Sequence, residues 1–324
     1  MTWRPRLADG TAPVLAVLAV LLVALACTGP AYTEPAGYLA LLKRAAPLVV
    51  LAIGQYFVVV SGGFDLSVGS LVTAEVVVAA RLVAGDDANT GWVIALLLGC
   101  GVLVGLVNGL ITTKLLVPSF IVTLGMLLVL DGAVFLWTGG APRGALSPSF
   151  RAFGRDGFDV PVLGRAPWSV VVLLVVLVLA VLFMRGRAGR TLLAVGDNDT
   201  AVRLAGGRVD RLRVLAFVLS GLLAAVAAIL LAGFAGVSAQ VGAGLEFRAI
   251  TAVVLGGVLL GGGRGSVVAA AAGALSLEAL FSLLNLLGVA GALESAVQGL
   301  IIIAAVAYAA RSRRVLRPRE PAVP

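Results

Sequence analysis

The sequence contains no histidine, and it carries few charges for its length of 324 residues. The absence of histidine removes the commonest metal ligand and the usual general base near neutral pH. Charged residues make up only 12% of the chain, whereas soluble domains average about 25%. The two cysteines, Cys27 and Cys100, lie far apart and show no metal-ligand spacing. We therefore expect neither a metal site nor a disulfide.

Motifs for nucleotide hydrolysis and covalent catalysis are also missing. A phosphate-binding loop needs a Gly-Lys pair, but Lys43 follows Leu42 and Lys114 follows Thr113, and these are the only lysines. No G-x-S-x-G sequence and no pair of carboxylates at helical spacing is present. We expect no catalytic residue and no cofactor in this chain, which is therefore not an enzyme by itself.

Apolar residues dominate what is present. They form 60% of the sequence, and the mean hydropathy is +1.11, so most of the chain must be solvated by lipid. The net charge of +8 comes from arginines in short segments that flank apolar runs. That arrangement orients a membrane protein, whereas nucleic-acid binding would need a basic face with interleaved aromatics. We therefore expect a lipid bilayer as partner and no nucleic acid.

The apolar runs predict an all-α polytopic membrane protein with about ten transmembrane helices. Several runs are shorter than the ~20 residues of an upright span, which predicts broken, tilted or buried helices. Placing both termini in the cytoplasm collects most of the arginines on that side. The predicted segments are 12–27, 45–61, 66–83, 92–113, 117–138, 168–184, 213–234, 247–260, 266–287 and 295–310.

Four hydrophilic segments complete this single domain of residues 1–324. Residues 1–11 and 311–324 are the predicted cytoplasmic N-terminus and tail, and residues 139–167 form a predicted periplasmic loop. Residues 185–212 form the largest predicted cytoplasmic segment. In it, Asp199 or Thr200 can cap a short helix over residues 201–205 that ends at Gly206-Gly207. Such a helix at the membrane surface either docks a soluble partner or is a solvated connector.

Residues 61–70, Ser-Gly-Gly-Phe-Asp-Leu-Ser-Val-Gly-Ser, must form a turn. About 36 residues separate Arg44 from Arg81, and a single helix of that length would measure roughly 54 Å, nearly twice the hydrocarbon thickness. Gly62 and Gly63 supply backbone freedom, and Asp65 or Ser67 can accept hydrogen bonds from the next helix. This capped turn either has no further purpose or lines a translocation path, as broken membrane helices often do.

Four carboxylates fall within or at the ends of predicted spans, namely Asp65, Glu75, Asp131 and Glu278. Intramembrane acids are typical of ion-coupled transporters. They support an alternative interpretation of the chain as an ion-coupled secondary transporter.

Four ordered motifs resemble those of ribose-type permeases, the membrane subunits of bacterial ABC sugar importers. SGGFDLSVGS (61–70) is similar to the signature GGIDLSVGS, and VPSFIVTLGML (117–127) is similar to P-x-F-I-x-T-L-G. The segment GRTLLAVGDNDTAVRLAGGRV resembles the family's cytoplasmic loop. AITAVVLGGVLLGGGRGSV and LLNLLGV resemble its closing helices. The resemblance covers about residues 40–310.

The resemblance implies a type II importer permease in the bacterial inner membrane. Its expected partners are a cytoplasmic ABC ATPase that binds ATP and Mg²⁺, a periplasmic sugar-binding protein, and a second permease subunit, identical or not. Residues of the signature turn and translocation path would be Gly62, Gly63, Asp65, Ser67, Gly69, Ser70, Phe120 and Thr123. Residues of the ATPase-coupling loop would be Gly196, Asn198, Ala201, Arg203, Leu204 and Gly206.

The sequence departs from the family pattern at several positions. Phe64 replaces an isoleucine, Val202 an alanine, and Asp131 stands where relatives often have arginine. These changes leave the transporter class intact and bear on the substrate. The resemblance implies a pentose or hexose, with an autoinducer, a nucleoside or a branched-chain amino acid as alternatives.

Overall fold

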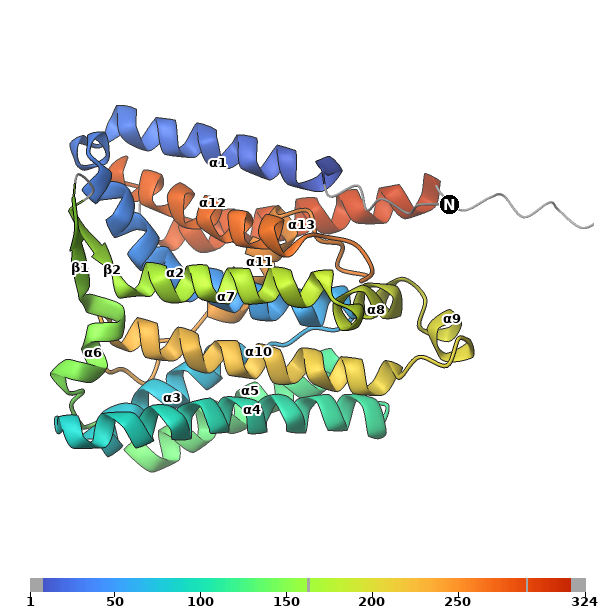
Figure 1. Cartoon of the computed structure of the whole chain (residues 1–324), viewed down its shortest axis with the longest axis horizontal. Helices are drawn as coiled ribbons and strands as arrows, with labels where there is room; N and C mark the ends of the chain where they lie inside the picture. The colour runs from blue at the N-terminus through green and yellow to red at the C-terminus, as the bar shows by residue number, and fades with distance from the viewer. Residues whose placement is uncertain (1–7, 162–163, 290, 316–324) are drawn as a thin grey trace, which may run out of the picture.

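The structure is a computed structural model that describes residues 8–161, 164–289 and 291–315. Long helices run nearly parallel to one another through the described part of the chain (Figure 1). The first half contains α1 (Ala8–Thr28), η1 (Pro30–Thr33), α2 (Pro35–Val60), α3 (Val68–Val83), η2 (Asp87–Asn89), α4 (Thr90–Lys114), α5 (Ser119–Thr138) and α6 (Pro148–Arg155). The second half contains β1 (Gly157–Val160), β2 (Gly164–Pro167), α7 (Trp168–Arg185), α8 (Arg187–Asp197), α9 (Asp199–Leu204), α10 (Val209–Ala232), α11 (Leu245–Leu255), α12 (Val267–Leu286) and α13 (Ala292–Val315).

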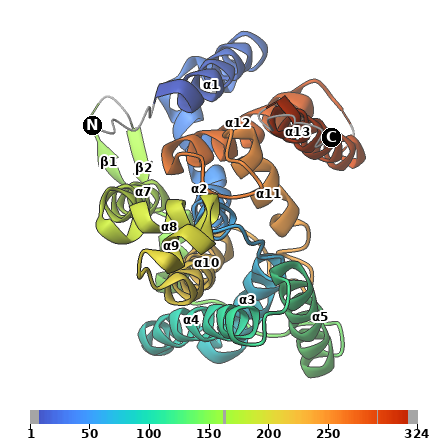
Figure 2. The same cartoon turned by 90° about the vertical axis from the view of Figure 1, so that its right-hand side faces the viewer.

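Helix α2 lies at the centre of the bundle. Every residue from Ala45 to Val60 is buried, because α7, α10, α11 and α12 pack around it. A helix that is apolar on all sides is expected in such a position, where no face meets water. In the end-on view, α3, α4 and α5 group on one side of α2 and α10, whereas α1, α12 and α13 group on the other (Figure 2).

Helices α4 and α10 pack through glycines at four-residue spacing. A Cβ atom on Gly101 would lie 2.4 Å from the Gly221 carbonyl oxygen, and one on Gly105 would lie 2.2 Å from that of Phe217. Small residues at this spacing let two helix backbones approach closely where no hydrophobic force drives them together. This contact fixes α10 against α4 beside the residues that hold the turn after α2.

Seven helices within the described residues are long and apolar enough to cross a membrane, by length and composition. They correspond to α1, α2, α4, α5, α7, α10 and α12. The other three predicted segments coincide with α3, α11 and α13, and α3 and α11 have only 16 and 11 residues. Ten crossings are therefore not confirmed, because two of the predicted spans form helices that are too short to cross the hydrocarbon core upright.

The two ends of the bundle carry different elements. At one end lie α6 and an antiparallel hairpin in which Gly157 pairs with Pro167 and Val160 with Gly164 (Figure 1). The segment 139–167, predicted as a loop, thus contains the short helix α6 and this hairpin. The opposite end carries α8 and α9, together with the described beginning of α1 and the described end of α13 (Figure 1). Residues 1–7 and 316–324 of the predicted termini lie outside the described residues.

Candidate functional site

The turn after α2 reverses the chain and leads it back into the protein. Gly62 adopts a φ of +90°, and the N–H groups of Gly62 and Gly63 donate to the carbonyls of Val59 and Val58. A left-handed glycine that closes a helix in this way satisfies carbonyls that would otherwise lack partners. Residues 63–66 then run without helical structure, and α3 begins only at Val68. The turn is thus the start of a re-entrant segment.

The carboxylate of Asp65 joins this re-entrant segment to α10. Its Oδ1 accepts hydrogen bonds from the Ser67 N–H at 3.0 Å and the Ser67 hydroxyl at 2.6 Å. Its Oδ2 accepts one from the Ser220 hydroxyl of α10 at 2.8 Å. Asp65 is only 1% exposed, so these three donors replace the water that would otherwise solvate the charge.

Two buried amides extend the network to α4 and α2. Asn108 of α4 donates its Nδ2 proton to the Ser67 hydroxyl at 2.9 Å, while that hydroxyl donates to Asp65. In the amide orientation that satisfies both groups, Gln55 of α2 donates to the Asp65 carbonyl at 3.0 Å and accepts from its N–H at 3.3 Å. Three helices therefore hold one aspartate, and each of these partners is buried.

This arrangement corrects the expected capping of α3. The side chain of Ser67 makes no capping hydrogen bond to the helix, because its hydroxyl is committed to Asp65 and Asn108. Asp65 accepts from Ser67, the residue that precedes α3, instead of from N–H groups inside the helix. The aspartate therefore fixes the entry to α3 and, more importantly, ties it to the rest of the bundle.

A cavity of about 1220 Å³ opens beside the N-terminal half of α3. Its polar lining comes from four elements: Ser70 and Thr73 of α3, Asp131 of α5, Ser238 and Gln240 of the connector before α11, and Glu246 of α11. Gly69 permits this packing, since a Cβ atom there would lie 2.7 Å from the Gly242 carbonyl oxygen. The Thr73 hydroxyl accepts a hydrogen bond from the Gly242 N–H at 2.9 Å. The lining holds two carboxylates and, among the described residues, neither lysine nor arginine.

Three glycine-bearing segments, namely the turn after α2, the last turn of α8 and the turn before α12, meet at the end of the bundle that carries α8. A Cβ atom on Gly196 of α8 would lie 1.9 Å from the Val60 carbonyl oxygen and 2.4 Å from the Gly263 nitrogen. Gly262 has a φ of +84°, and a Cβ atom there would lie 3.0 Å from backbone atoms of both Gly196 and Gly62. The Gly263 N–H donates to the Val60 carbonyl at 3.0 Å. We call this contact of residues 60–62, 196–197 and 262–263 the glycine junction.

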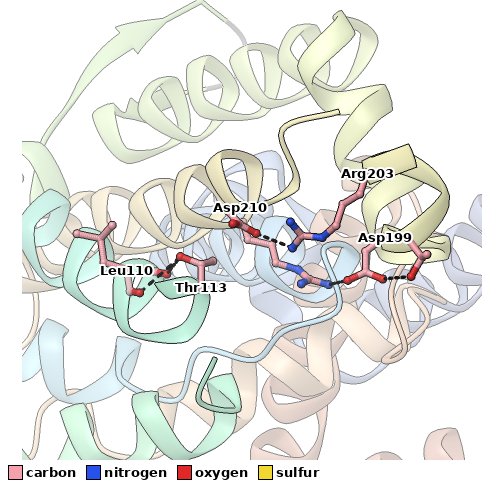
Figure 3. Close-up of polar contacts among 8 residues, drawn as sticks. Leu110, Thr113, Asp199, Arg203 and Asp210 are labelled. Carbon is pink, nitrogen blue, oxygen red and sulfur yellow. Dashed lines mark hydrogen bonds and ion pairs between the residues drawn. The ribbon is translucent and has the colours of Figure 1, made fainter. Parts of the chain in front are cut away.

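Helix α9 projects beyond the junction and is fixed by two ion pairs (Figure 3). Arg203 contacts Asp210 at 2.6 Å, and Arg213 contacts Asp199 at 3.2 Å. The hydrogen bond to Asp210 raises the pKa of the Arg203 guanidinium above its ordinary value. Both pairs join α9 to the first turns of α10, so they set the angle at which α9 leaves the bundle.

The cap of α9 is one residue earlier than predicted. Asn198, and neither Asp199 nor Thr200, caps the helix, with its side chain accepting from the Ala201 N–H at 2.9 Å. The reason is that Asp199 already belongs to the helix and pairs with Arg213. Gly206, with a φ of +80°, ends the segment as expected. Leu204 is 86% exposed.

The remaining candidate residues separate into different environments. The Thr123 hydroxyl donates to the Ser119 carbonyl at 2.9 Å and lies 3.3 Å from that of Phe64, so it contacts the re-entrant segment. Phe120 is 53% exposed and does not line the cavity. Glu75 is buried, and neither of its carboxyl oxygens has a hydrogen-bond partner within the described chain. Glu278 shares a pocket with Arg44 and Arg248.

Sequence reasoning missed several partners of the predicted residues. Gln55, Asn108 and Ser220 hold the signature turn, Glu246 lines the cavity, and Asp210 pairs with Arg203. The first three are polar residues inside strongly apolar helices, and that isolation was a usable signal. Which turn they face could not be read from their position in the sequence.

Comparison with known proteins agrees with this architecture. Residues 37–306 match the family described as branched-chain amino acid transport system / permease component. The chain belongs to this permease family. It is a multi-pass protein of the inner membrane and a transport component, and the sequence resemblance to ribose-type permeases is confirmed.

Individual relatives of this permease align over most of its length. The ribose import permease protein RbsC of Bacillus subtilis (strain 168) is 36% identical over 295 residues, which cover 89% of each chain. RbsC of Escherichia coli (strain K12) is 34% identical over 296 residues, 90% of this chain and 91% of the relative. The autoinducer 2 import system permease protein LsrC of Enterobacter sp. (strain 638) is 36% identical over 305 residues, 93% of this chain and 87% of the relative. No solved structure matches the chain significantly.

Replacing Asp65 should destabilise the permease strongly. Asp65→Ala leaves the Ser67 N–H and two hydroxyls without their buried acceptor, which should cost about 2–5 kcal/mol. Asp65→Asn should cost less, because its Oδ1 can still accept from Ser67 and the Ser220 hydroxyl can reverse to accept from Nδ2. The thermal unfolding midpoint of the purified protein in detergent measures this order. Asp159→Ala, which removes an exposed carboxylate in β1, is the control and should melt like the wild type.

The glycine junction predicts a difference between two glycine substitutions in helices. Gly196→Ala would place a methyl group against the Val60 carbonyl, so α8 must shift at a cost of about 1–3 kcal/mol. Gly99→Ala in α4 meets no atom within 4 Å and should be neutral or slightly stabilising. Gly196→Ala should lower the unfolding midpoint and raise the rate of proteolysis within residues 187–197, whereas Gly99→Ala should change neither in this way. Equal midpoints and equal proteolysis rates for the two variants would contradict close backbone packing at the glycine junction.

Proposed function

We propose that this chain is the membrane-spanning subunit of an ABC importer that translocates a monosaccharide of the ribose type. The observation that carries the proposal is the 34–36% identity to two ribose import permeases over about nine-tenths of each chain. The geometry supports it, because a helix that re-enters the core borders a large cavity into which four elements bring polar side chains. The LsrC relatives favour an autoinducer as the second candidate cargo.

The cavity beside α3 suits a neutral, polyhydroxylated solute. Its carboxylates, hydroxyls and amide can accept and donate hydrogen bonds to sugar hydroxyls. The absence of a basic residue among its described lining disfavours a solute with a free carboxylate, such as a branched-chain amino acid. Ser70 and Thr73, together with Asp131 and Glu246, are therefore the residues that we propose to contact the solute.

The energy for transport would come from a partner chain. We propose that a cytoplasmic ABC ATPase, which binds ATP and Mg²⁺, docks on α9, where Leu204 offers an exposed apolar anchor beside the ion-paired arginines. The glycine junction would pass a displacement of α8 and α9 to the end of α2 and hence to the signature turn. A periplasmic sugar-binding protein would deliver the solute to the opposite end, and a second permease subunit, identical or different, would complete the path.

Reconstitution tests the proposed function directly. Proteoliposomes that contain the permease, its ATPase and its binding protein should accumulate radiolabelled D-ribose only when ATP is present on the ATPase side. A catalytically inactive ATPase is the control. Uptake driven by a proton or sodium gradient without the ATPase would instead establish the ion-coupled alternative, in which Glu75 is the acid without a partner among the described residues. Autoinducer-2 replacing ribose as the transported solute would change the cargo and leave the class intact.

Leu204 predicts a specific loss of ATPase docking. Leu204→Asp places a charge where an apolar contact is proposed and should reduce co-purification of the ATPase at least tenfold, whereas membrane insertion and the unfolding midpoint stay unchanged. Leu116→Asp is the matched control, because Leu116 is 81% exposed in the connector between α4 and α5. Undiminished co-purification of Leu204→Asp would remove α9 as the docking element.

A further inference from the structure

A second cavity, of about 600 Å³, opens between helices that the transport path does not use. Its walls come from α1, the last turn of α7, α8 and the start of α12. They are mainly apolar, with Leu15, Val181, Met184, Leu193, Val267 and Val268 among the lining residues. Tyr56 of the central helix closes its floor, with its hydroxyl donating to the Gly265 carbonyl at 3.2 Å. We call this cavity the α1–α7 groove.

Two arginines line the groove without a partner in the described chain. Arg185 and Arg190 are both exposed, and neither forms an ion pair or side-chain hydrogen bond with another described residue. No described aspartate or glutamate lines the groove. A mainly apolar groove that carries two free positive charges, and no negative charge among its described lining residues, is complementary to a molecule with hydrocarbon chains and an anionic head.

The depth of these arginines fits a lipid headgroup. Helix α7 begins at Trp168, which is 45% exposed, and ends at Arg185 after 18 residues. Its length of about 27 Å is close to the ~30 Å hydrocarbon core. Tryptophan at one end and arginine at the other are the residues that sit at the two interfaces. Arg185 and Arg190 therefore lie at headgroup level, whereas Val181, Leu15 and Val268 lie at the level of acyl chains.

We infer that the α1–α7 groove binds an anionic phospholipid. Arg185 and Arg190 hold its phosphate, and one acyl chain occupies the apolar walls contributed by α1, α7 and α12. The occupant would fill the space between α1 and α7. Both helices pack on α12, and α7 also packs on α2 and α8. It would also hold α8, whose last turn forms part of the glycine junction.

Native mass spectrometry of the full-length permease tests this inference. The protein is released from detergent micelles that contain equal amounts of phosphatidylglycerol and phosphatidylcholine, and retained lipid is quantified. The wild type should retain more phosphatidylglycerol than phosphatidylcholine. Arg185→Gln with Arg190→Gln should lower that retention about 25-fold, because each arginine near a membrane surface contributes about fivefold. The matched control, Arg208→Gln with Arg211→Gln, removes the same charge in the connector before α10 and at its start, and should retain the lipid.

A change in the apolar wall separates lipid binding from simple charge attraction. Val268 is 40% exposed in the groove, so Val268→Trp should fill the acyl position and reduce retention of both lipids while both arginines remain. An unaltered size-exclusion profile verifies that each variant is folded. Equal retention of the two lipids by the wild type, or equal loss in the control pair, would overturn the inference. So would retention of phosphatidylglycerol only after deletion of residues 1–7, which would show that the chain itself fills the groove.

Discussion

The buried carboxylate of Asp65 is the constraint on which the arrangement of the central helices depends. A charge that is 1% exposed in a membrane bundle persists only if donors surround it, and Ser67 and Ser220 supply three of them. Ser220 belongs to α10. Asn108 of α4 donates to the Ser67 hydroxyl, and Gln55 of α2 pairs with the backbone of Asp65. The hydrogen bonds around one aspartate therefore fix three helices. The re-entrant segment cannot slide without leaving buried polar groups unpaired.

Close backbone contacts then carry this order to the end of the bundle. Glycines at positions 101, 105 and 221 bring α4 against α10, and those at positions 196, 262 and 263 bring α8 and the turn before α12 against the end of α2. Backbone atoms in contact cannot move aside by a change of side-chain rotamer. If α8 is displaced, it must therefore either move its neighbours or lose contact with them. The end of α2 and the end of α8, which leads into α9, are consequently in direct backbone contact.

Acidic and basic side chains line different cavities of the protein. The chain is strongly basic, yet the cavity beside α3 is lined by Asp131 and Glu246, whereas the α1–α7 groove is lined by Arg185 and Arg190. A cavity with two carboxylates and three hydroxyl groups suits the neutral solute that we propose, and a basic, apolar groove suits the lipid that we propose. The fold thus keeps the proposed solute cavity apart from the proposed lipid site.

Local patterns in the sequence determined the helical class, the position of the ten apolar segments and the turn at residues 61–70, because hydropathy and glycine placement act within a few residues. They also placed the short helix α9, although its cap is Asn198 instead of Asp199 or Thr200. Only the tertiary structure decided that α3 and α11 are short helices bordering a cavity, that Asp65 faces Ser220 at a separation of 155 residues, and that Gly196 meets Val60. Such contacts depend on how whole helices pack, and a lone polar residue in an apolar helix shows that it needs a partner without showing which one.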